Sequence, residues 1–324
     1  MSLGALAEVL RASVTGRVET DFPLARLTTY KLGGPVELYL EPDGIDDLVA
    51  LGKSLKELGS AGGRVPILAI GRGSNVVVSD AGIAGIAVRL GPKFSWIKQA
   101  GSALPGRVSV IAGASTPLPQ LANWAGRRGL EGLEYMVSIP GSVGGAVRMN
   151  AGAHGSEVEG AVELVTVFDI ETLTIEERTP PTLGFAYRGS TLGKKEIVLE
   201  ARFCLRVGDR DGVRARMDAY RRHRSDTQPG ALQNAGSVFK NPPGASAGRL
   251  VEEAGLKGSR IGGASVSTLH ANFFIAAEGA RAQDVYDLVN VVKARVLERF
   301  GVELTPEIRF LGEFEERANA EVTP

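Results

Sequence analysis

The chain has 324 residues, and its 37 lysines and arginines balance its 37 aspartates and glutamates. This length favours about two domains at roughly 150 residues each, and zero formal charge argues against a bulk polyanion binder or a polybasic membrane anchor. A hydrophobic fraction of 44% excludes wholesale disorder. The single cysteine, Cys204, permits no internal disulfide, which fits a reducing cytoplasm.

Apolar spacing predicts the elements in chain order. The pattern predicts helices from Asp43 to Gly59, from Pro117 to about Gly129, over 209–226 and over 282–300. It predicts strands at 65–70, 76–78, 86–90, 162–168, 174–178 and 197–205. Strands and helices interleave without βαβ units of regular length, so the predicted class is α+β. No signal peptide, membrane span or metal-ligand spacing is expected.

Glycine is in excess: it accounts for 42 of the 324 residues, about 13%, against a usual share of roughly 7%. The first informative group is Gly71, Arg72, Gly73, Ser74 and Asn75, directly after an apolar run. A glycine turn after a strand can present backbone N–H groups to a pyrophosphate. The group is not G-x-G-x-x-G and a strand follows it, which argues against a Rossmann nicotinamide site. A plain β-hairpin turn is the alternative.

A denser group of small residues lies in the middle of the chain. Its candidate cofactor-binding residues are Ser138, Ile139, Pro140, Gly141, Ser142, Gly144, Gly145, Ala146, Asn150 and Gly152. Little side-chain bulk over such a length suits main chain that follows an extended dinucleotide. The alternative is a tight turn in a core of small residues. Two such loops in one chain predict two walls of one groove.

Four further segments, at 185–190, 234–242, 270–273 and 305–310, complete a specific pattern. Together with the two glycine loops, in this order, they resemble the UDP-N-acetylenolpyruvoylglucosamine reductase (MurB) family. The loops themselves resemble a FAD-binding domain of the vanillyl-alcohol-oxidase/CO-dehydrogenase type. The resemblance runs from about Leu27 to Gly312. Only 49 positions separate Arg188 from Ser237, which resembles the shorter, second type of the family.

The resemblance implies a FAD-binding unit of two α/β subdomains, about 1–70 and 71–208, and an α+β substrate-binding domain over 209–301. It also implies that the segment 302–324, which carries Glu307, packs back on the FAD-binding unit. FAD would be held non-covalently, with NADPH as electron donor and a UDP-sugar as substrate. A monomer without nucleic-acid or membrane partners is expected.

The resemblance also implies residue roles. Arg188 and Glu307 would hold the substrate carboxylate, and Ser237 would protonate the α-carbon. Substrate contacts would come from Tyr187, Gln228, Lys240, Asn241 and Asn272. Each of these three residues also has an interpretation without a catalytic role. Arg188 would then be a surface arginine, Ser237 a hydroxyl in a turn, and Glu307 a solvated carboxylate.

Two other features of the sequence bear on the site. Arg221 and Arg224 are candidates to bind the diphosphate of a UDP-sugar through their positive charge. The alternative is that they lie on a solvated face of a helix. His154 is expected to be an exposed loop histidine and not a covalent flavin link.

Three other functions remain open at this point. One is a flavin oxidase that uses O₂, and a second is a nucleotide-sugar-binding protein without catalysis. A third is nucleic-acid binding through the basic stretch 206–224, which zero net charge disfavours.

Overall fold

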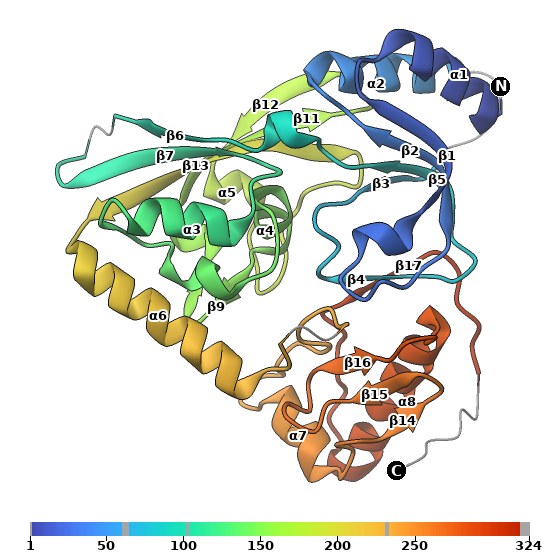
Figure 1. Ribbon diagram of the computed structural model, residues 1–324, viewed down its shortest axis with the longest axis vertical. Coiled ribbons are helices and arrows are strands. Elements are labelled where there is room, and N and C mark those ends of the chain that lie inside the picture. The colour runs from blue at the N-terminus through green and yellow to red at the C-terminus, as the bar shows by residue number, and fades with distance from the viewer. Residues whose placement is uncertain (1, 60–64, 102–103, 231–232, 318–324) are drawn as a thin grey trace. The chain divides into compact units, whose positions relative to one another are not determined.

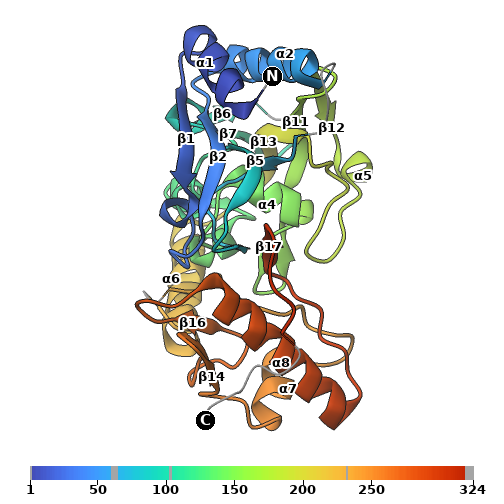
Figure 2. The same ribbon diagram turned by 90° about the vertical axis from the view of Figure 1, so that its right-hand side faces the viewer.

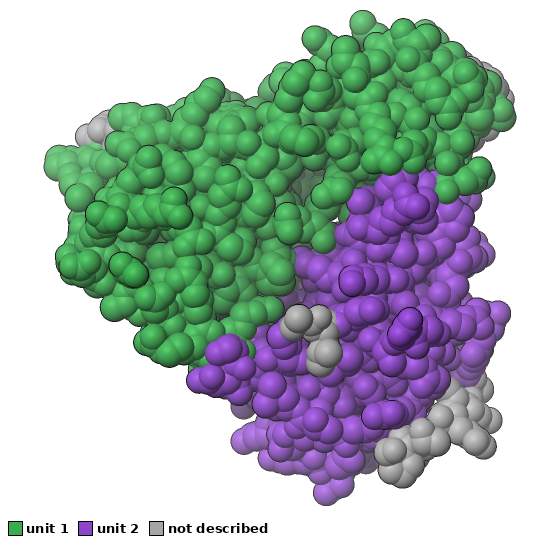
Figure 3. Space-filling view, in the orientation of Figure 1, with its two compact units in different colours: residues 1–21, 37–72, 85–224 green, residues 22–36, 73–84, 225–324 purple. Residues whose placement is uncertain are grey.

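The computed structural model describes residues 2–59, 65–101, 104–230 and 233–317 (Figure 1). The chain forms two compact units, coloured separately in Figure 3. Unit 1 comprises Met1–Asp21, Glu37–Arg72 and Gly85–Arg224, and unit 2 comprises Phe22–Val36, Gly73–Ala84 and Ser225–Pro324. These units divide the chain differently from the expected domains, because two N-terminal segments pack with the C-terminal part of the chain.

The first part of unit 1 combines two helices with a four-stranded sheet of order β1-β2-β5-β3. The elements are α1 (Leu3–Ser13), β1 (Arg17–Pro23), β2 (Pro35–Glu41), α2 (Ile45–Gly59), β3 (Ile67–Ala69) and β5 (Ile83–Val88). The two helices lie side by side in Figure 2. Leu6, Leu10, Leu48 and Leu51 from the helices share one apolar cluster with Leu38 of β2.

The second part of unit 1 is built on a six-stranded sheet of order β12-β11-β13-β7-β6, with β8 paired to β13. Its strands are β6 (Ile97–Ala100), β7 (Arg107–Gly113), β8 (Leu130–Glu131), β11 (Val162–Asp169), β12 (Thr174–Arg178) and β13 (Glu196–Val207). The helices are α3 (Leu118–Gly126), α4 (Val143–Met149), α5 (Pro180–Leu183) and α6 (Arg210–Thr227). A small hairpin pairs β9 (Gly152–Ala153) with β10 (Ser156–Glu157).

Helix α6 was expected to open the substrate-binding domain, yet most of it belongs to unit 1. Val213 and Met217 are buried in the core of that unit. The Arg216 guanidinium lies 2.8 Å from carboxylate oxygens of both Glu131 and Glu134. Apolar packing and ion pairing therefore hold this basic helix against the six-stranded sheet and its connections.

Unit 2 contains a three-stranded antiparallel sheet, two helices and one parallel strand pair. Its elements are β4 (Val76–Val78), α7 (Ala247–Glu253), β14 (Arg260–Ile261), β15 (Ala264–Val266), β16 (Phe274–Ala276), α8 (Ala282–Phe300) and β17 (Arg309–Leu311). Strand β17 pairs parallel with β4, so Arg309 lies opposite Val76. Short 3-10 turns occur at Leu24–Leu27 in unit 2 and at Pro92–Phe94, Glu134–Ser138 and Val158–Gly160 in unit 1.

The most strongly patterned elements were predicted correctly. Helix α8 spans 282–300 as expected, and its apolar face from Val285 to Val296 is buried. Gly301 closes it with a left-handed φ of +67°, which glycine adopts without steric cost. Strands β4 and β12 have the predicted bounds. The helices α1 and α4 were not predicted.

No helix in the described ranges has both the length and the apolar character needed to cross a bilayer.

Gly52 in the middle of α2 permits this helix to approach the loop after β11. A Cβ at Gly52 would lie 2.3 Å from Leu173 Cδ2 and 2.6 Å from the Ile170 carbonyl oxygen. We expect Gly52→Ala to lower the free energy of unfolding by about 1–3 kcal/mol, because this clash outweighs the gain in helix propensity. Urea denaturation measures the change.

The matched control is Gly59→Ala in the same helix, where a Cβ meets no described atom within 4 Å. It should be neutral or stabilising by up to roughly 1 kcal/mol. Equal stability changes in the two variants would contradict the role given to Gly52.

Candidate functional site

Unit 1 contains a cavity of about 430 Å³ between its two glycine loops. Gly71 and Arg72 of the first loop and Ser142, Gly144 and Gly145 of the second all line it. The volume lies within the usual range for small-molecule sites. The expected arrangement of two loops as walls of one groove is therefore confirmed within this unit.

Two of the glycines in these walls, Gly71 and Gly144, are closely packed against neighbouring residues. A Cβ at Gly71 would lie 2.7 Å from Ser142 Oγ, and a Cβ at Gly144 would lie 3.1 Å from Ala114 Cβ. At Gly145 an added Cβ meets only Ser142 Oγ, at 3.6 Å. A side chain at Gly71 would displace the Ser142 hydroxyl and one at Gly144 would crowd Ala114, whereas a Cβ at Gly145 would lie at an ordinary contact distance. The cradle accordingly fits a ligand that lies against bare main chain.

Charged side chains complete the cavity wall. Arg72, Arg89 and Arg148 line it together with Glu41 and Glu196. The Arg148 guanidinium is fixed by the carbonyl oxygens of Leu192 and Gly193, each at 3.1 Å, and by that of Glu196. Arginines beside a glycine-lined wall suit the phosphate groups of a dinucleotide. The residues present therefore fit part of an FAD molecule.

Gly73 of the first loop belongs to unit 2 and turns the chain sharply. Its φ is +60°, and a Cβ would lie 2.0 Å from the Leu27 carbonyl oxygen. After Ser74, which is half-buried, the Asn75 side chain donates to the Glu307 carbonyl oxygen at 3.1 Å. This loop is therefore tied to the C-terminal glutamate segment.

The second loop contains residues that support the site. Asn150 is fully buried, and its side-chain amide bonds Glu157 and the Ala186 carbonyl oxygen. Its expected contact with FAD stays a prediction. Ser138 donates to the Tyr135 carbonyl oxygen, and Ala146 is 4% exposed. Gly141 accepts a hydrogen bond from the Leu118 main chain. Ile139 packs against the unit 1 core, and Pro140 is exposed.

Ser237 and Glu307 come together in unit 2 although 70 residues separate them. The Glu307 N–H donates to the Val238 carbonyl oxygen at 2.7 Å, and the Lys240 N–H donates to that of Thr305. Isolated bridges join Ser237 to Phe273 and Phe239 to Pro306. Both Ser237 and Glu307 are half-buried. The serine and glutamate motifs thus form one local structure.

Arg188 lies in unit 1, in a tight turn whose ends are Ala186 and Gly189. The two main-chain hydrogen bonds between these end residues measure 3.0 and 3.1 Å. Arg188 has a φ of +58°, a conformation that costs energy for a residue other than glycine. Such strain persists where the surrounding structure holds it, and it is concentrated at functional sites. Its guanidinium pairs with Glu157 at 3.0 Å.

The expected substrate contacts fall into two groups. Asn272 is 4% exposed, and both ends of its amide bond the Phe239 main chain at 2.9 and 2.8 Å. Its side chain therefore holds the Ser237 segment in place. Asn241 Oδ1 accepts from the first residue of α7, Ala247.

The other three expected substrate contacts differ in exposure. Tyr187 is 45% exposed, and Lys240 is half-buried. Gln228 Oε1 is buried and has no hydrogen-bond partner among the described residues. A ligand or a water that donates to this oxygen would satisfy it.

Arg221 and Arg224, which could have met a diphosphate, form hydrogen bonds with other groups of unit 1. Arg221 donates to Asp218 and to Asn123, each at 2.6 Å. Arg224 donates to the Ser138 carbonyl oxygen, and burial lowers the pKa of its guanidinium. Both side chains therefore fasten α6 to the rest of unit 1.

His154 occupies the turn of the β9–β10 hairpin and is exposed, as expected. Its ring stacks on Tyr220 with centroids 4.0 Å apart and an interplanar angle of 9°. The His223 ring meets it edge-on at 5.5 Å. Partial desolvation of the ring, and secondarily the His223 charge, lower the pKa of His154.

Comparison with known proteins decides the family. The C-terminal domain of UDP-N-acetylenolpyruvoylglucosamine reductase matches residues 228–311, and an FAD-binding domain matches residues 36–173. A UDP-N-acetylenolpyruvoylglucosamine reductase of Bacillus thuringiensis subsp. konkukian is 41% identical over 310 residues, which cover 94% of this chain and 98% of the relative. The chain belongs to the UDP-N-acetylenolpyruvoylglucosamine reductase (MurB) family. Members of this family are flavoprotein oxidoreductases that use FAD and NADPH.

Two further relatives support MurB membership. The reductase of Heliobacterium modesticaldum is 44% identical over 293 residues, covering 90% of each chain. MurB from Thermus caldophilus, whose crystal structure is known, has 36% sequence identity to this chain. The two structures superpose with a TM-score of 0.76 over 92% of this chain and 100% of that one. The predicted resemblance and the α+β class are both confirmed.

Sequence reasoning missed two features of this chain. Arg148 and Glu196 line the cavity, although Arg148 lies within the second glycine group and was passed over there, and Glu196 lies in no glycine group. Glu157 pairs with Arg188 from a position 31 residues away. The sole local signal was His154-Gly155, a pair that suits a two-residue hairpin turn and so places Glu157 opposite Gly152.

Replacing Asn272 should test how the Ser237 segment is held. We expect Asn272→Ala to lower the free energy of unfolding by about 1–3 kcal/mol, because it leaves the Phe239 N–H and carbonyl without these partners. Asn241→Ala, which removes one bond at an exposed position, should cost about 1 kcal/mol or less. Thermal or urea unfolding measures both, and a larger loss for Asn241→Ala would contradict the assignment.

The hairpin turn should respond to pH through His154. Its lowered pKa means that the unfolded chain binds protons more readily than the folded one. The stabilising contribution is therefore complete above the ordinary value of 6.5 and is lost as the pH falls through the lowered pKa. NMR titration of the imidazole should give a pKa below 6.5, and His154→Gln should flatten the acid side of the stability profile. A value at or above 6.5 would contradict this.

Proposed function

We propose that this chain catalyses the NADPH-dependent reduction of the enolpyruvyl ether of UDP-N-acetylglucosamine to UDP-N-acetylmuramate, in the cytoplasm, as a step of peptidoglycan precursor synthesis. The observation that supports it most directly is the joining of the Ser237 and Glu307 segments by the bond from Glu307 N to Val238 O. A proton donor and a carboxylate-binding group are what this reaction needs beside the cofactor.

FAD, when bound, supplies the redox chemistry by taking a hydride from NADPH and giving it to the β-carbon of the enolpyruvyl group. The chain has to manage the negative charge that then develops at the α-carbon and spreads into the carboxylate. Arg188 supplies a fixed positive charge for that carboxylate, and Glu307 supplies a second polar contact, either protonated or sharing a proton. Fixed groups of this kind stabilise a transition state because they need no reorganisation.

Ser237 gives the proton to the α-carbon in this proposal. A serine hydroxyl is a weak acid, so the developing carbanion must be strongly basic or the alkoxide must be stabilised nearby. Lys240 follows three residues later, on the segment that the Glu307 motif holds through Thr305. Its ammonium group is the candidate for that stabilisation.

Binding is proposed to divide between the two matched regions. Residues 36–173 hold the FAD against the glycine-lined cavity, without a covalent bond. Gln228, Lys240 and Asn241 in the C-terminal match, with Tyr187, contact the UDP-sugar. The unsatisfied Gln228 oxygen supports this, since a sugar hydroxyl is a suitable donor.

Ser237→Ala should separate the two halves of the reaction. NADPH should still bleach the bound flavin at the wild-type rate, because the serine acts only in the step with the enolpyruvyl substrate. Product formation should fall by about 100-fold or more, the scale expected for a positioned acid. Stopped-flow absorbance of the flavin follows both steps.

Ser237→Cys is the matched variant, because a thiol retains a proton to give. It should keep more turnover than Ser237→Ala. Normal turnover in Ser237→Ala would remove this serine from the mechanism, and a wild-type protein that holds flavin yet does not reduce the substrate would refute the reaction.

A further inference from the structure

Arg188 is held by both strands of the β9–β10 hairpin. Its Nη1 donates to Glu157 Oε1 at 3.0 Å, and its Nη2 donates to the Gly152 carbonyl oxygen at 3.0 Å. Gly152 and Glu157 are direct partners in the hairpin register. One carboxylate and one carbonyl from the same rung therefore hold the two terminal nitrogens of the guanidinium.

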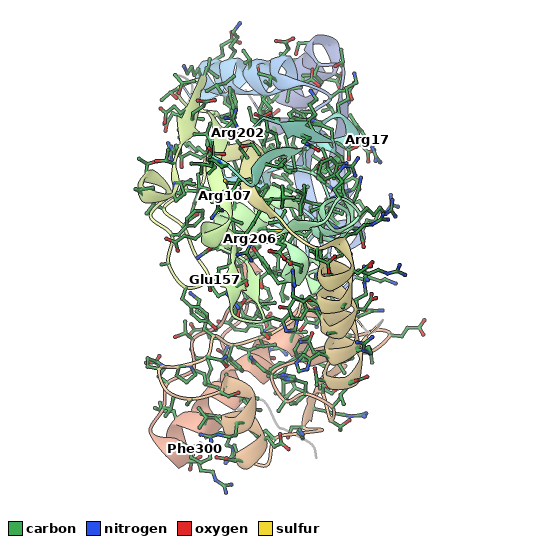
Figure 4. The ribbon with its side chains drawn as sticks, turned by 90° about the vertical axis from the view of Figure 1, so that its left-hand side faces the viewer. Arg17, Arg107, Glu157, Arg202, Arg206 and Phe300 are labelled. Carbon is green, nitrogen blue, oxygen red and sulfur yellow. The ribbon has the colours of Figure 1, made fainter. Side chains whose placement is uncertain are left out.

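Glu157 is itself oriented by a second bond. Its other oxygen, Oε2, accepts from Asn150 Nδ2 at 3.0 Å. Asn150 is fully buried and has a φ of +41° at the end of α4. The carboxylate is thus held at both oxygens, since Arg188 takes one and Asn150 takes the other. Glu157 is labelled in Figure 4.

The same asparagine connects this carboxylate to the turn that carries Arg188. Asn150 Nδ2 also lies 3.2 Å from the Ala186 carbonyl oxygen, and Asn150 Oδ1 accepts from the Glu159 N–H at 3.0 Å. A buried amide with these partners fixes the spacing between the hairpin and the Ala186–Gly189 turn. Buried polar networks whose members are bonded in this way hold their parts rigidly.

The hairpin is well placed to serve as a rigid support. His154 and Gly155 both have positive φ, at +53° and +77°, the pattern of a two-residue type I′ turn. The stack of His154 on Tyr220 fastens the turn to α6. A Cβ at Gly152 would lie 2.6 Å from Glu157 Cγ and 3.1 Å from Arg188 Nη1, so the rung admits only glycine without displacement.

We propose that Glu157 is a positioning residue that orients the Arg188 guanidinium for the substrate carboxylate, with Asn150 orienting Glu157 in turn. This inference rests on the proposed function, because it assumes that Arg188 binds the enolpyruvyl carboxylate. An arginine side chain has several rotatable bonds, and a fixed orientation removes the cost of ordering them when charge develops on the substrate. Glu157 acts through Arg188 and contacts no reacting atom.

The charge of Glu157 makes the expected kinetic signature specific. A carboxylate beside Arg188 offsets part of the positive charge, so it does not strengthen the attraction for an anionic substrate. Its removal should therefore affect the rate of the chemical step more than substrate affinity. We expect Glu157→Ala to lower kcat for substrate reduction by about 10-fold or more, while KM for the substrate changes by less than about 3-fold.

The test uses the FAD-loaded full chain and measures the two half-reactions by stopped-flow absorbance. Flavin reduction by NADPH should be unchanged in Glu157→Ala, which also shows that the variant is folded and loaded. Glu157→Gln keeps one acceptor but cannot accept at both positions, so its loss should be intermediate. Glu159→Gln removes the same charge from an exposed side chain two residues away and is expected to behave as wild type.

A double-mutant cycle separates a positioning role from a general structural one. In an Arg188→Ala background, Glu157→Ala should cause no further loss, because the group through which it acts is absent. Additive losses, an equal loss in the NADPH half-reaction, or wild-type kcat in Glu157→Ala would each overturn the proposal. Failure of the proposed function looks different, since wild-type protein would then not reduce the substrate at all.

Discussion

The parallel pairing of β17 with β4 is the constraint on which the arrangement of unit 2 depends. It joins residues 309–311 to residues 76–78, directly after the first glycine loop. The pairing holds Glu307 beside Asn75, and the main-chain bond from Glu307 to Val238 then fixes the serine motif as well. Three segments that are remote in the chain are thus held together by a few main-chain hydrogen bonds. The side chains of Ser237 and Glu307 depend on that framework for their place.

In unit 1 the main feature is the fixed orientation of one charged group, the Arg188 guanidinium. Arg188 stands in a left-handed turn that its residue type does not favour, and its side chain is held by a carboxylate and a carbonyl. The ion pair is partly buried, since the Arg188 side chain is 16% exposed and the Glu157 side chain 34% exposed. A pair this shielded from water is screened less than one on the open surface. The fully buried amide of Asn150 adds the rigidity that an isolated pair lacks.

The fold was predictable where the pattern of side chains is local. Helix α8 was predicted because its apolar residues recur at helical spacing, and Gly301 marks its end. Helix α4 escaped prediction because Gly144 and Gly145 are poor helix formers. It forms because Val143, Ala146 and Val147 are buried against the rest of unit 1. Tertiary packing outweighs local propensity there.

The sequence alone showed which kinds of reactive side chain are present and where small residues leave the main chain uncovered. The two glycine loops stand out by residue type alone, whereas the serine, arginine and glutamate motifs were identified through their resemblance to a known family. Only the tertiary structure decided which groups meet. The contacts of Glu307 with the serine motif and of Glu157 with Arg188 link residues far apart in the chain. No local pattern encodes such contacts, since they exist only once the strands have paired and the turns have closed.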